Sequence, residues 1–596
     1  MMFKTLRRRL GGLTESVVRF PATVGFLVAA AVMIAVSISG EDDLGRYILT
    51  CAVGAVACAA AEAAYERFLS GSLWRLLITG AGLVVTLLFY LSVRLLPQNS
   101  PEMLVRPAVT MFALFIAFVW VGVIRSRYGF NESFMAAFKA LVQAVFFTGI
   151  LFLGCAAVIA AVDTLITPVD EDAYMHTANI VFVIIAPLIL LSLIPVYPGR
   201  VIPDAVVPDG GKQAVLIEKR TGSPKFLEVL LSYIIIPLAT VFTVILLAYI
   251  LLNISGKFWT DNLLEPMLIA YAVTVIVVTL LVSRLGNRLA ELFRLMFPKV
   301  LIPIALFQTI ASFLLLMDTG VTYGRYYVIL FGVFAIFSGF ALSLKPEGKA
   351  GSVALALILL SAVSLIPPVD AFTVSRESQV AALETALEKN GMLINDVVRP
   401  KGDIPEDDKQ VIITSVRYLT ETEELDAAAW LPARFNGYDD TAFYSTFGFH
   451  MYTPTQPGPA YVSVYLDRAG VIQVGGYDVM LQLNIPPFDK PGGTGSTFEL
   501  GGAVYAVTTD ESGGNYAIVV TDAAGRERIR FDTAGIFARY LEYNAEKGVM
   551  TLEEATFTAE NEHAALKIIV QNAGFVKMPD ITDENAQLYV LVRIKN

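Results

Sequence analysis

The sequence has few charged residues and few cysteines for its length. Of its 596 residues, 16% are Asp, Glu, Lys or Arg, whereas soluble globular proteins contain about 25%. This shortage of charge, together with 55% hydrophobic residues, argues against a soluble enzyme and predicts a membrane protein. The three cysteines, Cys51, Cys58 and Cys155, all lie in apolar segments, where a small thiol packs well between helices. Residues 373–596 contain no cysteine, so no disulfide stabilises them.

Charge is also distributed unevenly along the chain. Residues 1–372 contain 26 Lys/Arg and 22 Asp/Glu, whereas residues 373–596 contain 18 and 32. The second part is therefore an acidic soluble region, long enough to form its own hydrophobic core. Its acidic excess argues against nucleic acid as a partner, because phosphates repel a negatively charged surface.

Hydrophobic segments long enough to cross a bilayer occupy most of the first part. About 20 apolar residues span the hydrocarbon core. We expect 11 spans, at 21–39, 47–64, 73–93, 107–124, 140–162, 177–196, 226–252, 264–283, 300–317, 327–344 and 351–369. The longest loop, 197–225, divides them into a six-helix block (21–196) and a five-helix block (226–369). Residues 286–298 are amphipathic and predict a helix that lies in the membrane interface.

Positive charge in the connecting loops predicts the orientation. If the basic N-terminus, residues 1–20, is cytoplasmic, the cytoplasmic loops contain about 21 Lys/Arg and the outer loops about 5. Cytoplasmic loops retain positive charge during insertion. An odd number of spans then places the C-terminal part outside. Because that part lacks disulfides, we expect the protein in a bacterial cytoplasmic (plasma) membrane.

The C-terminal part predicts two kinds of structure. Residues 370–435 predict helices, one of them at 406–421. Residues 436–596 predict mainly strands, with hairpins at 461–474 and 505–521. The fold class expected for the chain is an α-helical polytopic bundle joined to an extracytoplasmic α+β domain rich in antiparallel β structure.

Few residues are candidates for chemistry. Asp170, Asp172 and His176 could share a divalent cation, because carboxylates and a neutral imidazole are suitable ligands; a solvated acidic loop is the alternative. Pro187 and Pro237 lie inside expected spans, where they could open backbone carbonyls to a substrate path or could simply kink the helices. We predict no catalytic residue and no cofactor.

Several stretches of the chain resemble one known family. They are Phe20-Pro21 before the first span, FLEVLLSYIIIPLATVFTVILLAYILL at 226–252, RLGNRLAELFRLMFPKVLIPIAL at 284–306, PPVDAFTVSRESQVAALETALEKNGML at 367–393, DDKQVIITSVRYL at 407–419 and Trp430-Leu431-Pro432. Together they resemble the bacterial membrane-protein family catalogued as domain of unknown function 4153, over essentially the whole chain. The resemblance implies a polytopic inner-membrane protein with an extracytoplasmic tail. It implies no activity and no site residues.

Three functions remain open from the sequence. The first is non-enzymatic sensing, binding or assembly in the cell envelope through residues 373–596, with the lipid bilayer and a further envelope protein or cell-wall ligand as partners. The second is a permease or a transporter of lipids or small molecules. The third is a membrane glycosyl- or acyltransferase that uses Asp170, Asp172 and His176. We favour the first, because ionisable side chains in the spans fall near span ends rather than at mid-membrane.

Overall fold

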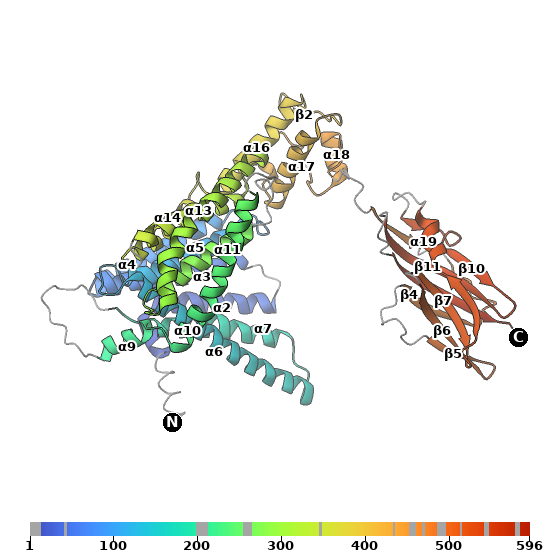
Figure 1. Ribbon diagram of the computed structural model, residues 1–596, viewed down its shortest axis with the longest axis horizontal. Helices are drawn as coiled ribbons and strands as arrows, with labels where there is room; N and C mark the ends of the chain where they lie inside the picture. Colours follow the sequence, from blue (N-terminus) through green and yellow to red (C-terminus); the bar gives the residue numbers. More distant parts are fainter. Residues whose placement is uncertain are drawn as a thin grey trace. The chain divides into compact units, whose positions relative to one another are not determined.

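The chain forms two compact units, Met1–Met451 and Tyr452–Asn596. The computed structural model describes residues 13–40, 44–197, 212–253, 265–344, 348–432, 435–451, 460–467, 471–485, 496–512, 515–541, 548–577 and 584–595. The first unit contains the helical bundle, and the second consists mainly of β-strands (Figure 1). The acidic segment 41–43 and residues 198–211 of the loop 197–225 lie outside the described residues.

The bundle is built from apolar helices. In chain order they are α2 (Pro21–Ser39), α3 (Gly45–Phe68), α4 (Ser72–Val93), α5 (Glu102–Val121), α6 (Phe130–Leu165), α7 (Asp172–Ala178), η1 (Asn179–Ile185), α8 (Ala186–Leu193), α9 (Lys212–Thr221), α10 (Lys225–Leu230), η2 (Leu231–Ile235), α11 (Ile236–Asn253), α12 (Glu265–Leu281), α13 (Arg288–Thr319), α14 (Tyr323–Leu344) and α15 (Ala350–Val363). Elements η1 and η2 are π-helical turns that continue directly into α8 and α11.

Within the described residues, nine helical stretches are long and apolar enough to cross a membrane. They are Pro21–Ser39, Gly45–Phe68, Ser72–Val93, Glu102–Val121, Phe130–Leu165, Asp172–Leu193, Ile217–Leu252, Arg288–Leu316 and Tyr323–Leu344. Two shorter apolar helices, α12 and α15, coincide with the other two expected spans. The chain is therefore a multi-pass membrane protein that contacts lipid.

Helix α3, which is rich in alanine, lies inside the bundle. Half of its most apolar window is buried, and it packs against α2, α4 and α5. Small side chains permit this close packing: a Cβ added to Gly82 would lie 3.2 Å from the Cys58 sulfur. Cys58 is accordingly a free, buried thiol between helices.

The segment 286–298 differs from expectation because it is not a separate helix. It forms the start of α13, which continues through Pro298 and Pro303. The Asn287 side chain caps this helix by accepting from the Ala290 N–H at 2.9 Å. Phe293 is fully buried in a cluster that includes residues of α10, α11 and α12. Packing by neighbouring helices lets a helix continue through proline, so the prolines do not end this one.

A helical segment follows the last apolar helix and belongs to the first unit. It comprises α16 (Ala371–Lys389), β1 (Leu393–Ile394), β2 (Val397–Val398), α17 (Glu406–Glu421), the short 3-10 turn η5 (Leu425–Ala427) and α18 (Asp440–Phe447). Helix α17 confirms the expected helix at 406–421. The segment has its own core, which includes Leu383, Leu387, Ile412, Phe443 and Phe447.

Strand structure begins later than the expected boundary at 436. Helix α18 occupies part of this region, capped by the Asp439 side chain, which accepts from the Thr441 N–H at 2.8 Å. Gly448, with φ +82°, ends the helix in the left-handed conformation. Its buried rings, Phe443 and Phe447, pack in the helical segment rather than in a β domain. Local caps and helical spacing thus outweighed the strand preference of aromatic residues.

The second unit contains two sheets, mainly antiparallel, that share one core. The strands are β3 (Ala460–Leu466), β4 (Val479–Ile485), β5 (Ser496–Leu500), β6 (Ala503–Ser512), β7 (Asn515–Asp522), β8 (Glu527–Asp532), β9 (Val549–Met550), β10 (Thr556–Glu560), β11 (Ala564–Lys577) and β12 (Glu584–Ile594). One sheet has the order β4-β12-β11-β3-β9 with β10 on β11, and the other has the order β5-β6-β7-β8. Helix α19 (Ala534–Leu541) contributes Ile536 and Tyr540 to the shared core. The β3–β9 pair is parallel.

One of the two expected hairpins is present and the other is wrong. Strands β6 and β7 pair antiparallel, which confirms the hairpin at 505–521. Residues 471–474 form no strand, and β3 pairs instead with β11, for example Tyr465 opposite Asn572. The long strand β11 provides a partner that the four-residue local segment could not match.

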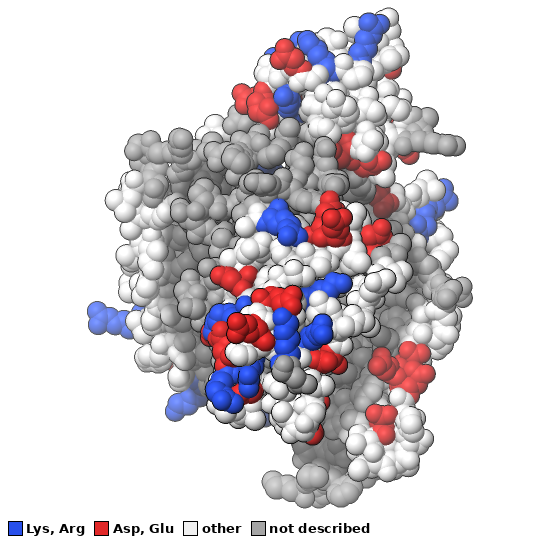
Figure 2. All heavy atoms as spheres, turned by 90° about the vertical axis from the view of Figure 1, so that its right-hand side faces the viewer, with Lys and Arg blue, Asp and Glu red and all other residues white. Residues whose placement is uncertain are grey.

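On the face shown in Figure 2, acidic and basic side chains lie interspersed.

Candidate functional site

Arginine side chains donate to backbone carbonyls at helix ends on one face of the bundle. The Arg19 guanidinium donates to the Ile194 carbonyl at 2.8 Å, and Arg220 donates to the Leu193 carbonyl at 2.8 Å. The last carbonyls of a helix lack intrahelical partners, and a cation there also complements the helix dipole. On this face, Arg19 and Arg220 therefore stabilise the C-terminal end of α8.

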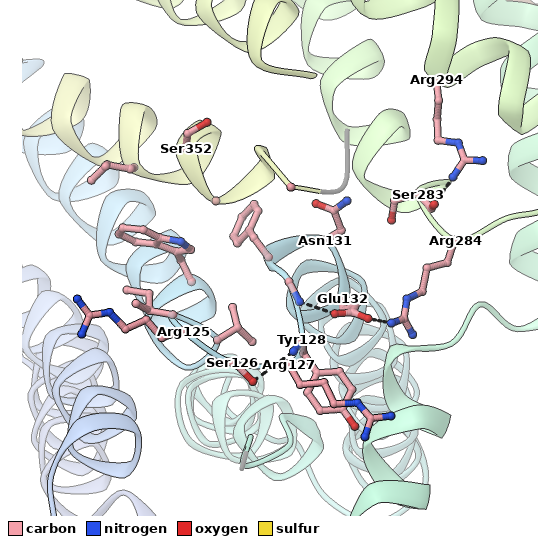
Figure 3. Close-up of a pocket in the computed structure, with 18 of the residues that line it drawn as sticks. Arg125, Ser126, Arg127, Tyr128, Asn131, Glu132, Ser283, Arg284, Arg294 and Ser352 are labelled. Atoms are coloured by element: carbon pink, nitrogen blue, oxygen red, sulfur yellow. Dashed lines mark hydrogen bonds and ion pairs between the residues drawn. The ribbon is translucent and has the colours of Figure 1, made fainter. Parts of the chain in front are cut away.

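A pocket of about 1020 Å³ opens on this face between three helix junctions (Figure 3). One wall is the connection from α5 to α6, the second is the connection from α12 to α13, and the third is the start of α15. The lining residues are 120, 123–132, 283–286, 294, 348, 351, 352 and 355. Four of them are arginines and one is a carboxylate, so the pocket is strongly positive.

Hydrogen bonds hold the α5–α6 connection in place. The Arg67 guanidinium, from α3, donates to the Ile124 carbonyl at 2.6 Å and also to the Arg125 carbonyl. The Glu132 carboxylate, in the first turn of α6, accepts from the N–H of Gly129, the residue that precedes this helix. These contacts fix the backbone that carries the first two arginines of the pocket.

The second wall is joined to the first by an ion pair. Arg284, which follows α12, pairs with Glu132 of α6. Arg294, from α13, donates to the Leu285 carbonyl at 3.2 Å and to the Ser283 carbonyl. Both guanidiniums thus have partners in the pocket wall, as Figure 3 shows.

The other two arginines of the pocket differ from these. Arg125 and Arg127 are both exposed. Among the residues that the structure describes, neither guanidinium has a hydrogen-bond or ion-pair partner.

On the third wall of the pocket, Gly351 allows α15 to approach α5, because a Cβ there would lie 3.0 Å from the Trp120 indole nitrogen.

A buried ion network lies at the end of the bundle from which α16 begins. The Arg106 Nη2 atom, from α5, donates to Asp370 Oδ1 at 3.0 Å, and its Nε atom pairs with the Glu102 carboxylate. Asp370 is fully buried and caps α16 by accepting from the N–H groups of Phe372 at 3.2 Å and Thr373 at 3.1 Å. One carboxylate therefore both starts the first helix of the helical segment and binds that helix to α5. We call this network the α5–α16 joint.

Polar and aromatic contacts extend this attachment to the α13–α14 loop. The Gln379 side chain donates to the Val321 carbonyl at 2.9 Å. The Tyr323 and Phe372 rings stack with their centroids 5.0 Å apart, and the Tyr323 N–H donates to the Tyr418 hydroxyl at 3.2 Å. The helical segment is thus packed onto the bundle through residues of α16 and α17.

Glu424, which follows α17, is a poorly hydrated carboxylate near the α5–α16 joint. Burial raises the pKa of Glu424 to about 7, although its ion pair with Arg376 at 3.3 Å acts in the opposite direction. The nearby carboxylates of Glu102 and Asp370 raise the pKa further. Glu424 therefore changes its charge near neutral pH.

This shift implies a pH-dependent stability. Because the folded-state pKa of Glu424 exceeds the unfolded value of 4.5, its contribution is fully present below pH 4.5 and is lost as the pH rises through about 7. We expect the thermal midpoint of the full-length protein in detergent to fall between about pH 5 and about pH 8. The variant Glu424→Gln should lose this part of the fall. Identical pH profiles for the two proteins would contradict the assignment.

The acidic residues expected to bind a cation lie at the start of α7. Asp170 Oδ1 accepts from the Asp172 N–H at 3.0 Å, a contact that helps to begin the helix. His176 Nε2 lies 3.4 Å from the Ser39 hydroxyl of α2. Among the described residues, no group of three or more His, Cys, Asp or Glu side chains is placed to hold a metal ion. These three are thus not assembled into one cluster.

Pro187 and Pro237 occupy equivalent positions that sequence reasoning had not recognised. Each is the second residue after a π-helical turn, η1 before Pro187 and η2 before Pro237. Both lie in the pattern Ile-Ile-x-Pro-Leu. A proline ring clashes with the carbonyl four residues earlier, and the wider turn before it relieves that clash. The shared pattern was the available sequence signal for these breaks.

Polar side chains at each π-helical turn bind a neighbouring helix. The Asn179 side chain in η1 donates to the Ala31 carbonyl of α2 at 2.8 Å. The Ser232 hydroxyl in η2 accepts from the Asn287 side chain at 2.8 Å. The two helix breaks are therefore anchored to neighbouring elements.

Comparison with known proteins gives one match. A model of the family described as "Domain of unknown function (DUF4153)" matches residues 26–394. No curated protein and no solved structure was found to match the chain.

Proposed function

The chain belongs to the DUF4153 family, and from that premise we propose that it is a non-enzymatic binding or sensing protein of the bacterial plasma membrane. Its N-terminus is cytoplasmic, and residues 370–596 lie outside. The outer part binds an envelope protein or a cell-wall ligand, and the helical segment passes that event to the bundle.

The α5–α16 joint is the observation that carries this proposal. Arg106, Glu102 and Asp370 are all less than a tenth exposed in their side chains. Breaking one partner of a buried ion pair costs about 3–5 kcal/mol. A displacement of α16 is therefore expected to move or strain α5 as well. A sensor needs this kind of mechanical coupling between its outer part and its bundle.

The charge distribution supports the orientation. The connections α5–α6 and α12–α13 carry Arg125, Arg127 and Arg284. Together with Arg294 of α13, they line one pocket on a single face. The α5–α16 joint lies at the opposite end of α5, which runs from Glu102 to Val121. If the arginine-rich face is cytoplasmic, as positive loops usually are, the joint and the helical segment are outside.

The test compares the full chain with a chain that ends at Met451, the boundary between the two units. Both are purified from the same cells in mild detergent, and bound proteins and small molecules are quantified by mass spectrometry. We expect at least one partner that copurifies with the full chain but not with the chain that lacks residues 452–596. Identical partners for both chains would count against binding through the β unit.

A transporter is the second candidate, and the paired helix breaks favour it. Broken helices in corresponding positions often flank a substrate site. Replacing Pro187 and Pro237 with alanine should abolish a transport activity but leave partner binding by the outer part unchanged. A transferase that uses Asp170, Asp172 and His176 stays the third hypothesis. In that case alanine at these three positions should abolish function.

A further inference from the structure

We propose that the arginine-lined pocket binds the phosphate group of an anionic ligand. Among the described residues that line the pocket, four are arginines and one is a carboxylate, and that carboxylate, Glu132, is already engaged by Arg284 and by the Gly129 N–H. A guanidinium offers paired N–H donors whose geometry matches phosphate oxygens. The excess of positive charge in a concave site therefore selects an anion.

Ordinary helix capping does not account for two of the cations that line the pocket, Arg125 and Arg127. Arg19, Arg67 and Arg220 on this face all donate to backbone carbonyls. Arg125 and Arg127, by contrast, have no guanidinium partner among the described residues. Within the described part of the chain these two cations remain available to a ligand, and Figure 3 shows their guanidiniums on opposite sides of the pocket.

The pocket is also held in shape before any ligand arrives. Arg67 fixes the carbonyls of Ile124 and Arg125, and the Arg284–Glu132 pair joins two of the walls. A preformed site loses less conformational entropy on binding than a flexible loop does. The backbone that carries Arg125 and Arg127 is therefore in place before an anion binds.

Two helix N-termini add to the positive potential. Residues in the first turns of α6 and of α15 line the pocket. The N-cap of α15, Lys349, makes no side-chain capping hydrogen bond. The unpaired N–H groups and dipole of a helix start attract phosphate. At this pocket they act together with the arginines.

The position of the pocket suggests which molecules carry the phosphate. Trp120 and Tyr128 line it, and such rings are enriched at the depth of lipid headgroups. Its volume of about 1020 Å³ also accommodates a phosphate attached to a larger group. The shared chemistry is a phosphate ester, carried either by an anionic lipid or by a soluble metabolite.

The experiment uses the full-length protein and two double variants that each remove two positive charges. Arg125→Gln with Arg127→Gln changes the pocket. Arg288→Gln with Lys225→Gln is the matched control, because both residues are exposed and neither lines the pocket. A third variant, Arg125→Lys with Arg127→Lys, keeps the charge but not the guanidinium geometry, and it remains informative if the glutamine pair fails to fold.

Two measurements distinguish the sources of the phosphate. Native mass spectrometry in detergent measures retained phosphatidylglycerol against phosphatidylcholine, and equilibrium dialysis measures bound inorganic pyrophosphate. We expect one of these probes to bind about tenfold more weakly to the glutamine pocket variant, with the lysine variant intermediate and the control unchanged. An effect on the lipid alone identifies a headgroup site, and an effect on pyrophosphate alone identifies a soluble ligand.

Either of two results would overturn the proposal. One is that neither probe binds the wild-type protein in preference to phosphatidylcholine or buffer. The other is that the control and pocket variants lose affinity equally, which would assign the binding to general surface charge. Because the full chain is used with its β unit present, failure here leaves the proposed outer partner untouched.

Discussion

Replacing Asp370 with alanine is expected to destabilise the protein by about 3–5 kcal/mol. The substitution removes one partner of a buried ion network and, among the described residues, leaves the Arg106 guanidinium with Glu102 as its only carboxylate partner, beside the Leu365 carbonyl at 3.4 Å. It also removes the two N-cap hydrogen bonds to Phe372 and Thr373. The free energy can be measured by SDS-induced unfolding of the full chain in mixed micelles.

Asp439→Ala provides the matched control. Asp439 is also an N-cap, at α18, but it is exposed and forms a single capping bond to Thr441. We expect this change to cost only about 1 kcal/mol. The variant Asp370→Asn retains a capping oxygen and should isolate the effect of the charge. Equal losses for Asp370→Ala and Asp439→Ala would show that the network contributes nothing beyond the cap.

Gly339→Ala is expected to cost about 1–3 kcal/mol, although alanine favours helices. Helices α13 and α14 approach so closely that a Cβ at position 339 would lie 2.7 Å from Ile302 Cγ1 and 2.9 Å from the Pro298 carbonyl oxygen. The backbone oxygen cannot move aside without shifting α13. The same SDS-induced unfolding measures the loss.

Gly154→Ala in α6 is the control with the opposite sign. An added Cβ there meets nothing within 4 Å, so only the helix preference of alanine remains. We expect a gain of up to about 1 kcal/mol. A gain of similar size at both glycines would show that the α13–α14 contact is looser than described.

Most of the fold that could be predicted from the sequence was predicted from the length of apolar segments and from local helix-capping patterns. The long apolar runs predicted the membrane helices, and the pattern at 406–421 predicted α17. Structure that depends on distant partners was not predictable in this way. Strand β3 pairs with β11, about 110 residues away in sequence, rather than with the nearest segment, and no local pattern specifies that choice.

The candidate site was hidden for the same reason. Arg125, Arg127 and Arg284 are among the loop charges whose count predicted the orientation, but their convergence on one pocket depends on how four helices pack. Arg106 and Asp370 are separated by 264 residues, so nothing in the sequence links them. The π-helical turns before Pro187 and Pro237 did leave a signal, the repeated Ile-Ile-x-Pro-Leu pattern.

The orientation of the bundle is the central claim, and cysteine labelling tests it most directly. The three native cysteines, Cys51, Cys58 and Cys155, are replaced by alanine, and single cysteines are introduced as Arg288→Cys and Glu388→Cys, both at exposed helical positions. Spheroplasts are treated with a membrane-impermeant maleimide before and after permeabilisation.

Our account predicts that the cysteine at 388 is labelled in intact spheroplasts. The cysteine at 288, on the arginine-rich face, should be labelled only after permeabilisation. Labelling of position 288 alone in intact spheroplasts would invert the topology. It would place the arginine-lined pocket outside and the α5–α16 joint in the cytoplasm, and the proposed outer binding function would be wrong.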